Sequence, residues 1–209
     1  MIKIRNLKYI EKKSGFSVEC MNLNAESGKR LGIYGGSASG KTLFTQILSG
    51  IIKNYSGSIE IGITELRNTY RKKIGYVPFD NILYRELTVK EMSLLLLDQY
   101  KVPEPELKIK SEWFSNYFDM SDMWSKKIFS LTSGQLQTVK FFTGLIHSPS
   151  LFIIDEPFNG MGDDDVFRIN KLLRDLAGID VSVIAASSHK GYLENITDVQ
   201  AVISKGKIE

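Results

Sequence analysis

The chain has 209 residues, of which 43% are hydrophobic and 24% are charged, and its formal net charge is +3 at pH 7. This length suits one large domain with a buried core, and so small a charge gives no reason to expect a nucleic-acid partner. The single cysteine, Cys20, excludes an internal disulfide and a cysteine-based metal cluster. Apolar runs fall short of the roughly 20 residues that span a bilayer, and the N-terminus lacks a signal peptide's apolar core. We therefore expect a soluble, intracellular protein. If it acts at a membrane, another protein would hold it there.

The first part of the chain alternates apolar and polar residues with the period of a strand. This pattern predicts strands at residues 2–7 and 16–23, and short apolar segments predict further strands at 58–62 and 74–77, after a turn at 55–57. Antiparallel strands followed by strands that alternate with helices predict an α/β fold with a β-rich lobe.

A glycine-rich loop then carries the first chemical motif. Residues 35–42 fit the phosphate-binding pattern G-x-x-x-x-G-K-[ST], between an apolar strand at 31–34 and a helix at 42–48. Backbone N–H groups at such a helix start favour phosphate, Lys41 adds a positive charge for the β- and γ-phosphates, and Thr42 can ligate Mg²⁺. The predicted nucleotide-binding residues are Gly35, Gly36, Ser37, Ala38, Ser39, Gly40, Lys41, Thr42 and Leu43.

Residues 83–130 change character and show no strand pattern. Thr88 and Glu91 have the spacing of a capping box, which predicts a helix through residue 100, and a second helix is predicted at about 107–118. We therefore predict one domain over residues 1–209, with an α/β core and β lobe formed by 1–82 and 131–209. Residues 83–130 form an inserted helical subdomain in this prediction.

The last third alternates helices with buried strands. Leu-Thr-Ser-Gly-Gln at 131–135 begins a helix that either Thr132 or Ser133 can cap. An apolar strand at 151–154 ends in Asp155-Glu156-Pro157, a helix follows at about 163–176, and a strand at 181–186 leads to Ser187-Ser188-His189. A last strand is predicted at 199–204.

The order of these motifs resembles the ATP-binding cassette (ABC) family of ATPases over essentially the whole chain. Residues 74–78 and 87–91 are similar to the cassettes of exporters and related transporters. The resemblance implies a P-loop NTPase core with a mixed sheet, an N-terminal antiparallel β lobe and an inserted helical subdomain, with ATP and Mg²⁺ as cofactors.

The resemblance also implies roles for individual residues. Asp155 would hold Mg²⁺ through water opposite Thr42, and Glu156 would act as general base or orient the attacking water. His189 would contact the γ-phosphate, so that Glu156, His189 and Lys41 form the catalytic set. A strand-ending acidic pair or a lone histidine is often structural, but their joint order favours the catalytic interpretation.

In the family, two cassettes dimerise head to tail, and each Leu-Ser-Gly-Gly-Gln segment closes on the ATP of the other. Here Thr132, Ser133, Gly134 and Gln135 would make that contact. Ser133 stands where the family has a glycine, so its side chain would slightly narrow the space through which the backbone amides approach the γ-phosphate. Tyr9 is the first candidate for stacking on adenine, and Phe16 is the second.

Two positions depart from the family pattern. Phe79 stands where a glutamine would reach Mg²⁺, and Gly162 stands where an aspartate would couple the two ATP sites. Asp80 or Asp163, each one residue further on, could substitute after a local rearrangement. We expect weaker Mg²⁺ ligation and weaker coupling between the sites.

The expected function is the ATP-hydrolysing subunit of a membrane transporter, acting on a separate transmembrane permease from the cytoplasmic face of the membrane. Its second partner would be another cassette, either a second copy of this chain or a paralogue. No nucleic-acid partner is expected. The alternatives are a soluble ABC ATPase of an assembly system, such as the iron–sulfur type, and a degenerate ATP-binding regulatory cassette. An aromatic set could line a groove for the permease or form the subdomain core: Trp113, Phe114, Tyr117, Phe118 and Trp124.

Overall fold

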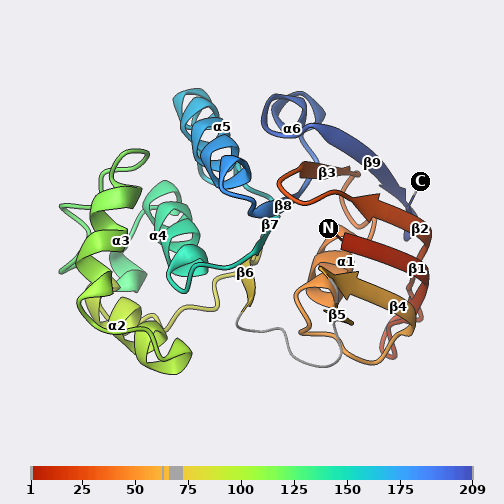
Figure 1. The fold of residues 1–209 in the computed structure, drawn as a ribbon, viewed down its shortest axis with the longest axis horizontal. Coiled ribbons are helices and arrows are strands. Elements are labelled where there is room, and N and C mark those ends of the chain that lie inside the picture. The colour runs from red at the N-terminus through yellow and green to blue at the C-terminus, as the bar shows by residue number, and fades with distance from the viewer. Residues whose placement is uncertain (1, 63, 66–72, 209) are drawn as a thin grey trace.

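A computed structural model describes residues 2–62, 64–65 and 73–208. Its strands form a ten-stranded sheet in the order β5-β4-β1-β2-β10-β9-β3-β8-β7-β6, and the helices lie on both sides of it (Figure 1). The sheet is mixed, as expected for the predicted α/β class.

The N-terminal strands form the antiparallel lobe. β1 (Ile2–Ile10) pairs with β2 (Ser17–Ala25) on one side and β4 (Ser56–Ile61) on the other, and β4 pairs with the short β5 (Thr64–Glu65). β4 begins earlier than predicted, at Ser56, and Gly57 within it passes so close to β1 that a Cβ atom would lie 2.3 Å from the Asn6 carbonyl oxygen.

The parallel strands form the rest of the sheet. β3 (Arg30–Tyr34) lies between β8 (Ser182–Ser187) and β9 (Val199–Ser204), and β7 (Leu151–Asp155) lies between β8 and β6 (Ile74–Val77). All five residues of β7 are buried, as its unbroken apolar sequence predicts. The short β10 (Lys207–Ile208) joins the two parts, pairing with β2 and β9.

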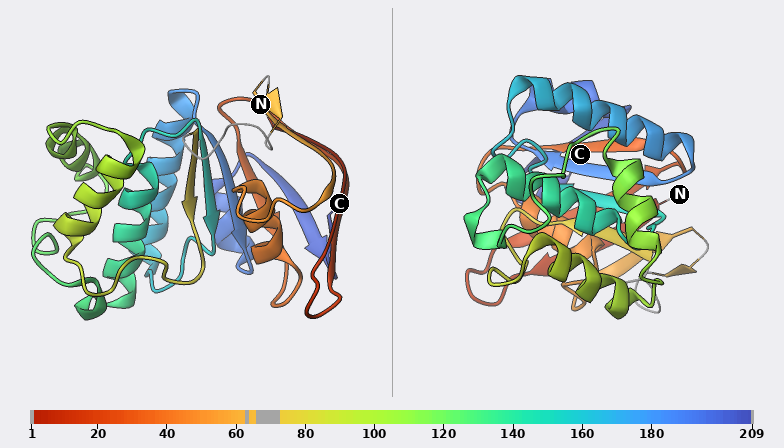
Figure 2. Two further views of the ribbon diagram at one scale, coloured as in Figure 1. Left: turned by 90° about the horizontal axis from the view of Figure 1, so that it is seen from below. Right: turned by 90° about the vertical axis from the view of Figure 1, so that its left-hand side faces the viewer.

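Helices cover the two faces of the parallel strands. α1 (Lys41–Leu48) lies between these strands and the curved antiparallel lobe (Figure 2), where Phe44 and Ile47 share a core with Ile4 and Ile153. α5 (Asp163–Gly178) and α6 (Lys190–Ile196) pack on the opposite face.

The remaining helices form a separate group beside the sheet. They are α2 (Val89–Tyr100), α3 (Glu106–Phe114), the 3₁₀ turn η2 (Ile128–Ser130) and α4 (Ser133–Leu145). The capping box predicted for α2 is present, with Thr88 and Glu91 bonded reciprocally.

α3 ends four residues before its predicted end at residue 118. Beyond it the N–H groups of Asn116 and Tyr117 donate to the carbonyls of Trp113 and Phe114, three residues back, which is the tighter turn common at helix ends. Phe114 and Phe118 are buried core residues, so much of the aromatic set fills the interior.

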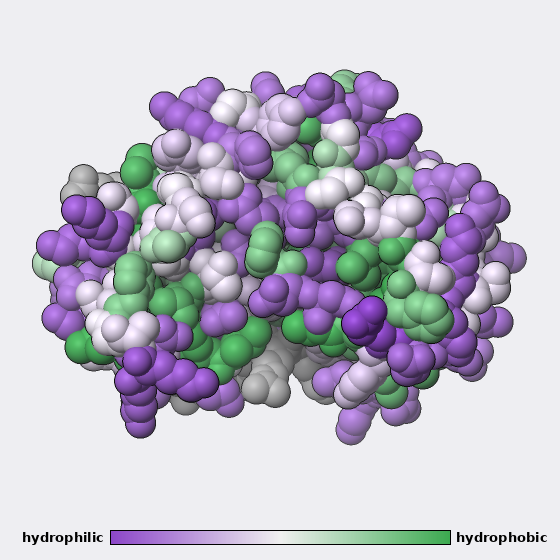
Figure 3. Space-filling model, turned by 180° about the vertical axis from the view of Figure 1, so that it is seen from behind, coloured by the Kyte–Doolittle hydropathy of each residue, from purple (hydrophilic) through white to green (hydrophobic). Residues whose placement is uncertain are grey.

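The rear surface carries hydrophobic residues in separate patches among hydrophilic ones (Figure 3). Within the part of the chain that the structure describes, no helix has both the length and the apolar character needed to cross a bilayer.

Candidate active site

The glycine-rich loop lies between β3 and α1, in the context that the motif requires. Gly40 caps α1 with φ 104°, and Ala38 adopts φ 57°, so the loop turns through left-handed conformations. A Cβ atom at Gly35 would lie 2.5 Å from the Ile203 carbonyl oxygen, so only glycine lets the loop pack this closely. The first N–H groups of α1 therefore point toward a space in which a phosphate can bind.

A cavity of about 410 Å³ opens beside this loop. Segments far apart in the sequence surround it: the phosphate loop, the turn after β6, the turn after β7 and the end of β8. The lining residues are Ser37, Ala38, Lys41, Thr42, Phe79, Glu156, Phe158, Asn159, Gly160, Ser188 and His189.

Lys41 is buried and lines this cavity. Its Nζ donates to the carbonyl oxygens of Gly35 and Gly36, at 2.8 and 2.9 Å, and lies 3.4 Å from Glu156 Oε1. The lysine predicted to bind phosphate is thus placed beside the predicted general base.

Asp155, the last residue of β7, is fully buried, and neither carboxylate oxygen has a hydrogen-bond partner among the described residues. Burial raises the pKa of Asp155 to about 6, an effect that the nearby Thr42 hydroxyl and Lys41 oppose. A buried carboxylate without a partner is unfavourable unless a cation binds it. Together with the Thr42 hydroxyl it is an oxygen donor set of the kind that Mg²⁺ prefers, so these residues fit the metal.

Glu156 follows in a strained backbone conformation, with φ 53°. Its Oε2 accepts a hydrogen bond from the Ser187 hydroxyl at 2.9 Å, and its Oε1 accepts one from the Ser188 N–H at 3.0 Å. Left-handed conformations of non-glycine residues often mark functional sites. Here the conformation directs the carboxylate at the cavity beside Lys41.

His189 is the N-cap residue of α6 and lines the same cavity. Its backbone N–H donates to the Ser187 hydroxyl oxygen at 3.1 Å, so that Ser187 contacts both Glu156 and His189. The imidazole ring lies 5.8 Å from the Tyr192 ring, centroid to centroid.

Sequence reasoning missed two polar residues that α4 directs at this site. Gln137 Nε2 donates to the Glu156 and Pro157 carbonyls, both at 3.3 Å, and Lys140 Nζ donates to the Phe79 carbonyl at 2.9 Å. The two residues are 2% and 4% exposed, and their spacing of three puts them on one helix face. A charged residue flanked by Val139, Phe141 and Phe142 is the signal that could have identified Lys140.

The residues of the 131–135 segment do not line this cavity. Thr132 caps α4, bonded reciprocally with Gln135 at 3.3 and 3.2 Å, while Gly134 and Gln135 border a different cavity of about 460 Å³. Ser133 is exposed at the first turn of α4. The α4 N-terminus thus lies outside the cavity that the phosphate loop lines.

The structure also locates Phe79 and Gly162, the two residues that depart from the family pattern. Phe79 and Asp80 are both exposed, and Phe79 borders the cavity whereas Asp80 is not among its lining residues. Gly162 is the N-cap residue of α5, and the next residue, Asp163, accepts a hydrogen bond from the Tyr192 hydroxyl.

The two candidates for adenine contact lie in the antiparallel lobe. Tyr9 is in β1 and half-buried, while the Phe16 ring lies 3.0 Å from where a Cβ atom of Gly40 would be. Phe16 is therefore the candidate that contacts the phosphate loop directly.

Comparison with known proteins identifies the class of protein that this fold and site define. Residues 18–159 match the family model for ABC transporters, so the chain belongs to the ABC transporter family. It is 28% identical, over 99% of its length and 75% of the other chain, to the ABC transporter ATP-binding protein MJ1023 of Methanocaldococcus jannaschii. It is 25% identical, over 100% of its length and 68% of the other chain, to the linearmycin resistance ATP-binding protein LnrL of Bacillus subtilis.

Solved structures share the fold. One, an ATP-binding subunit of an ABC transporter, superposes with a TM-score of 0.89 at 20% identity, over 100% of this chain and 88% of the other. The dimeric MJ0796 cassette superposes with a TM-score of 0.87 at 22% identity, over 100% and 97%.

These findings confirm the resemblance inferred from the motifs and the predicted P-loop α/β fold. The chain is an ATP-binding subunit of an ABC transporter, and ATP hydrolysis is the general activity of its family. The solved MJ0796 cassette is itself dimeric.

Proposed function

We propose that this chain hydrolyses ATP with Mg²⁺ in a site shared by two cassettes, and that the resulting motion drives a separate transmembrane permease. The observation that carries the proposal is the convergence of Lys41, Glu156 and His189 on one cavity beside the phosphate loop. Lys41 binds the β- and γ-phosphates of ATP, Glu156 orients and deprotonates the attacking water, and His189 contacts the γ-phosphate. A positioned general base typically contributes about 10²–10⁴-fold in rate.

The metal site in this proposal consists of the Thr42 hydroxyl and, through water, the Asp155 carboxylate. Its support is the buried carboxylate of Asp155, which lacks a partner among the described residues. Bound Mg²⁺ supplies positive charge that offsets the phosphate oxygens of ATP.

The nucleotide is held by the phosphate loop and by an aromatic side chain of the antiparallel lobe. The backbone of residues 35–43 surrounds the phosphates, with Ser37 and Ala38 at the cavity wall. For the adenine ring we propose Phe16 ahead of Tyr9, because Phe16 contacts Gly40.

The second half of each site is the α4 N-terminus of another cassette. Thr132 to Gln135 begin α4, and Ser133 is exposed there, so backbone N–H groups can reach a γ-phosphate bound to the other chain. A second copy of this chain is sufficient to complete the site in this arrangement.

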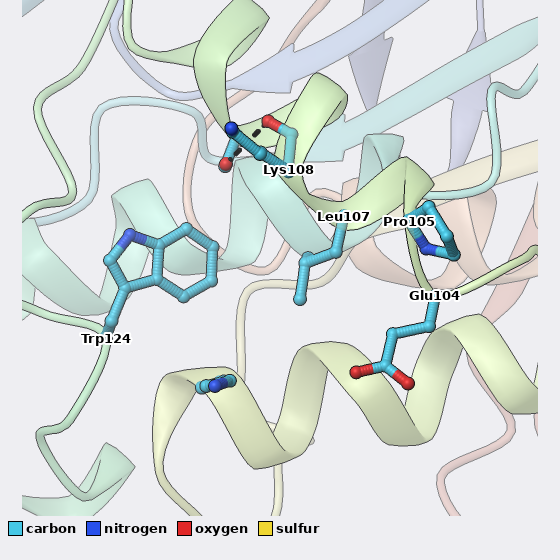
Figure 4. Close-up of a pocket in the computed structure, with 7 residues that line it drawn as sticks. Glu104, Pro105, Leu107, Lys108 and Trp124 are labelled. Carbon is cyan, nitrogen blue, oxygen red and sulfur yellow. Dashed lines mark hydrogen bonds between the residues drawn. The ribbon is translucent and has the colours of Figure 1, made fainter.

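Residues 83–130 form the subdomain that faces the permease in this proposal, on the inner face of the cell membrane. A groove of about 620 Å³ lies between α2 and α3, with Leu107 and Trp124 directed into it and Glu104 and Lys108 at its edge (Figure 4). Trp124 is half-buried, unlike the core residues Phe114 and Phe118, and offers an apolar contact to a helix of the permease.

Mg²⁺-dependent ATP turnover of the purified chain tests this function, with Glu156→Gln as the inactive control and Glu112→Gln as the matched surface control. We expect turnover that rises more than linearly with protein concentration and that Glu156→Gln alone abolishes. ATP binding without turnover in the unmodified chain would contradict the proposal and favour a regulatory cassette.

A further inference from the structure

Lys140 is a buried lysine that the proposed reaction does not use. It lies in the middle of α4, is 4% exposed, and is followed by Phe141 and Phe142, both of which belong to the hydrophobic core. Lysine is almost never buried this fully without a partner, because its ammonium group loses hydration. Its position therefore calls for a specific role.

The Lys140 ammonium group lies at the edge of the proposed metal site. Its Nζ donates to the Phe79 carbonyl at 2.9 Å, and Phe79 itself borders the cavity that Lys41 and Thr42 line. The charges that act on it are the carboxylates of Asp155 and Asp80, both of which favour its protonated form. Burial lowers the pKa of Lys140 to about 8, so it is mainly a cation at pH 7.

This cation stands next to the position where the sequence departs from the family pattern. The glutamine expected to reach Mg²⁺ is replaced by Phe79, whose side chain has no metal-binding atom. The Phe79 backbone is instead fixed to α4 by Lys140. The site has thus lost a neutral metal ligand and carries a fixed positive charge within electrostatic range of Asp155.

We propose that Lys140 is a resident cation of the ATP site, which lowers the dependence of ATP binding on Mg²⁺. Its charge offsets part of the negative charge of Asp155 and of the incoming phosphates, so metal-free ATP binds better than it otherwise would. The same charge repels Mg²⁺, so the gain in affinity that the metal brings is smaller. Lys140 is not a catalytic residue in this account, because it acts by its charge and contacts the Phe79 carbonyl.

The inference rests on the metal site of the proposed function, and one titration separates the two. A fluorescent, non-hydrolysable ATP analogue is titrated at pH 7 with excess Mg²⁺ and with EDTA, and the ratio of the two dissociation constants is compared between variants. Lys140→Met removes the charge and the hydrogen bond, whereas Lys140→Gln removes the charge and keeps a donor for the Phe79 carbonyl. Thermal unfolding of each variant checks that it is folded, and Lys126→Met, at an exposed lysine, is the matched control.

We expect the Mg²⁺ effect to grow by about fivefold or more in both Lys140 variants, from electrostatics at short range in a partly buried site. Lys126→Met should match the unmodified chain. An unchanged ratio in Lys140→Met, or a Lys140→Gln variant that behaves like the unmodified chain, would overturn the proposal. Asp155→Asn should remove the Mg²⁺ effect, and if it does not, the metal site itself is wrong, whatever Lys140 does.

Discussion

The Ser187 hydroxyl donates a 2.9 Å hydrogen bond to the carboxylate of Glu156 and accepts one from the backbone N–H of His189 at 3.1 Å. One side chain at the end of β8 therefore holds the carboxylate of the proposed general base, Glu156, and the backbone of His189 at the start of α6. Together with the Ser188 N–H, it holds the carboxylate that the left-handed backbone of Glu156 directs at the cavity.

Replacement of Ser187 by alanine should lower turnover without loss of ATP binding. We expect kcat to fall about 10-fold with KM nearly unchanged, because a hydrogen bond to a charged group is worth roughly 1.5–3 kcal/mol and the Ser188 N–H remains. Steady-state kinetics measure this. Ser182→Ala, at the other end of β8, should leave kcat unaltered, and an equal loss in both variants would contradict a specific role.

Phe79→Gln should raise turnover. The amide oxygen would supply a polar group at the cavity wall, where the phenyl ring has none, and we expect an increase of about 3- to 10-fold from an interaction of order 1 kcal/mol. The control is Phe129→Gln, at another exposed phenylalanine. A rate that stays the same or falls would count against the view that Phe79 weakens metal ligation.

The capping box at the start of α4 should contribute measurably to the free energy of unfolding. Thr132→Ala removes the side-chain acceptor for the Gln135 N–H and should cost about 1 kcal/mol of the free energy of unfolding. Thr88→Ala removes the equivalent acceptor at the start of α2 and is the matched comparison. Denaturant titration gives both values, and a loss in Thr88→Ala alone would mean that Thr132 is not the effective cap.

His147 should make the stability of the fold depend on pH. Burial lowers the pKa of His147 to about 4, and its Nε2 contacts the Ile74 carbonyl at 3.1 Å while its ring stacks on Tyr100. Since the unfolded chain binds a proton from about pH 6.5 and the folded chain only near pH 4, stability is lost as the pH falls through this window. The free energy of unfolding should fall by about 3 kcal/mol across this window because of His147 alone.

His147→Phe keeps an aromatic ring against Tyr100 and removes the titration. Its free energy of unfolding should therefore fall less steeply than that of the unmodified chain between pH 6.5 and 4. Parallel curves for the two proteins would show that His147 is not the titrating group.

Much of the fold follows from local sequence patterns. β6 and β9 have their predicted bounds, and the phosphate loop lies in its predicted strand–loop–helix context, because apolar runs and glycine spacing are local signals. The end of α3 was missed because the backbone tightens into turns at Asn116 and Tyr117 while the buried aromatic residues continue at helical spacing.

The proposed site was less accessible to sequence reasoning where it depends on tertiary contact. Asp155, Glu156 and His189 lie at or just after the ends of two neighbouring parallel strands, so their convergence could be predicted. The roles of Gln137 and Lys140 could not be predicted, because they depend on how α4 packs against other parts of the chain. Gln137 bonds to Glu156, 19 residues away in sequence, and Lys140 bonds to Phe79, 61 residues away.

The central claim is that a phosphate loop and an α4 N-terminus from two different chains form each working site. Mixing two inactive variants tests it most directly: Lys41→Ala, which disables the phosphate loop, and Ser133→Glu, which places a negative charge where the γ-phosphate would approach. A carboxylate at the first turn of α4 favours the helix, so the second variant should stay folded.

Each variant alone should be inactive, and an equal mixture should recover about a quarter of the unmodified turnover, because half of the dimers would contain one complete site of two. ATPase activity of the mixture gives the answer. Recovery near that level supports the shared site, and a mixture no more active than its separate components would contradict it.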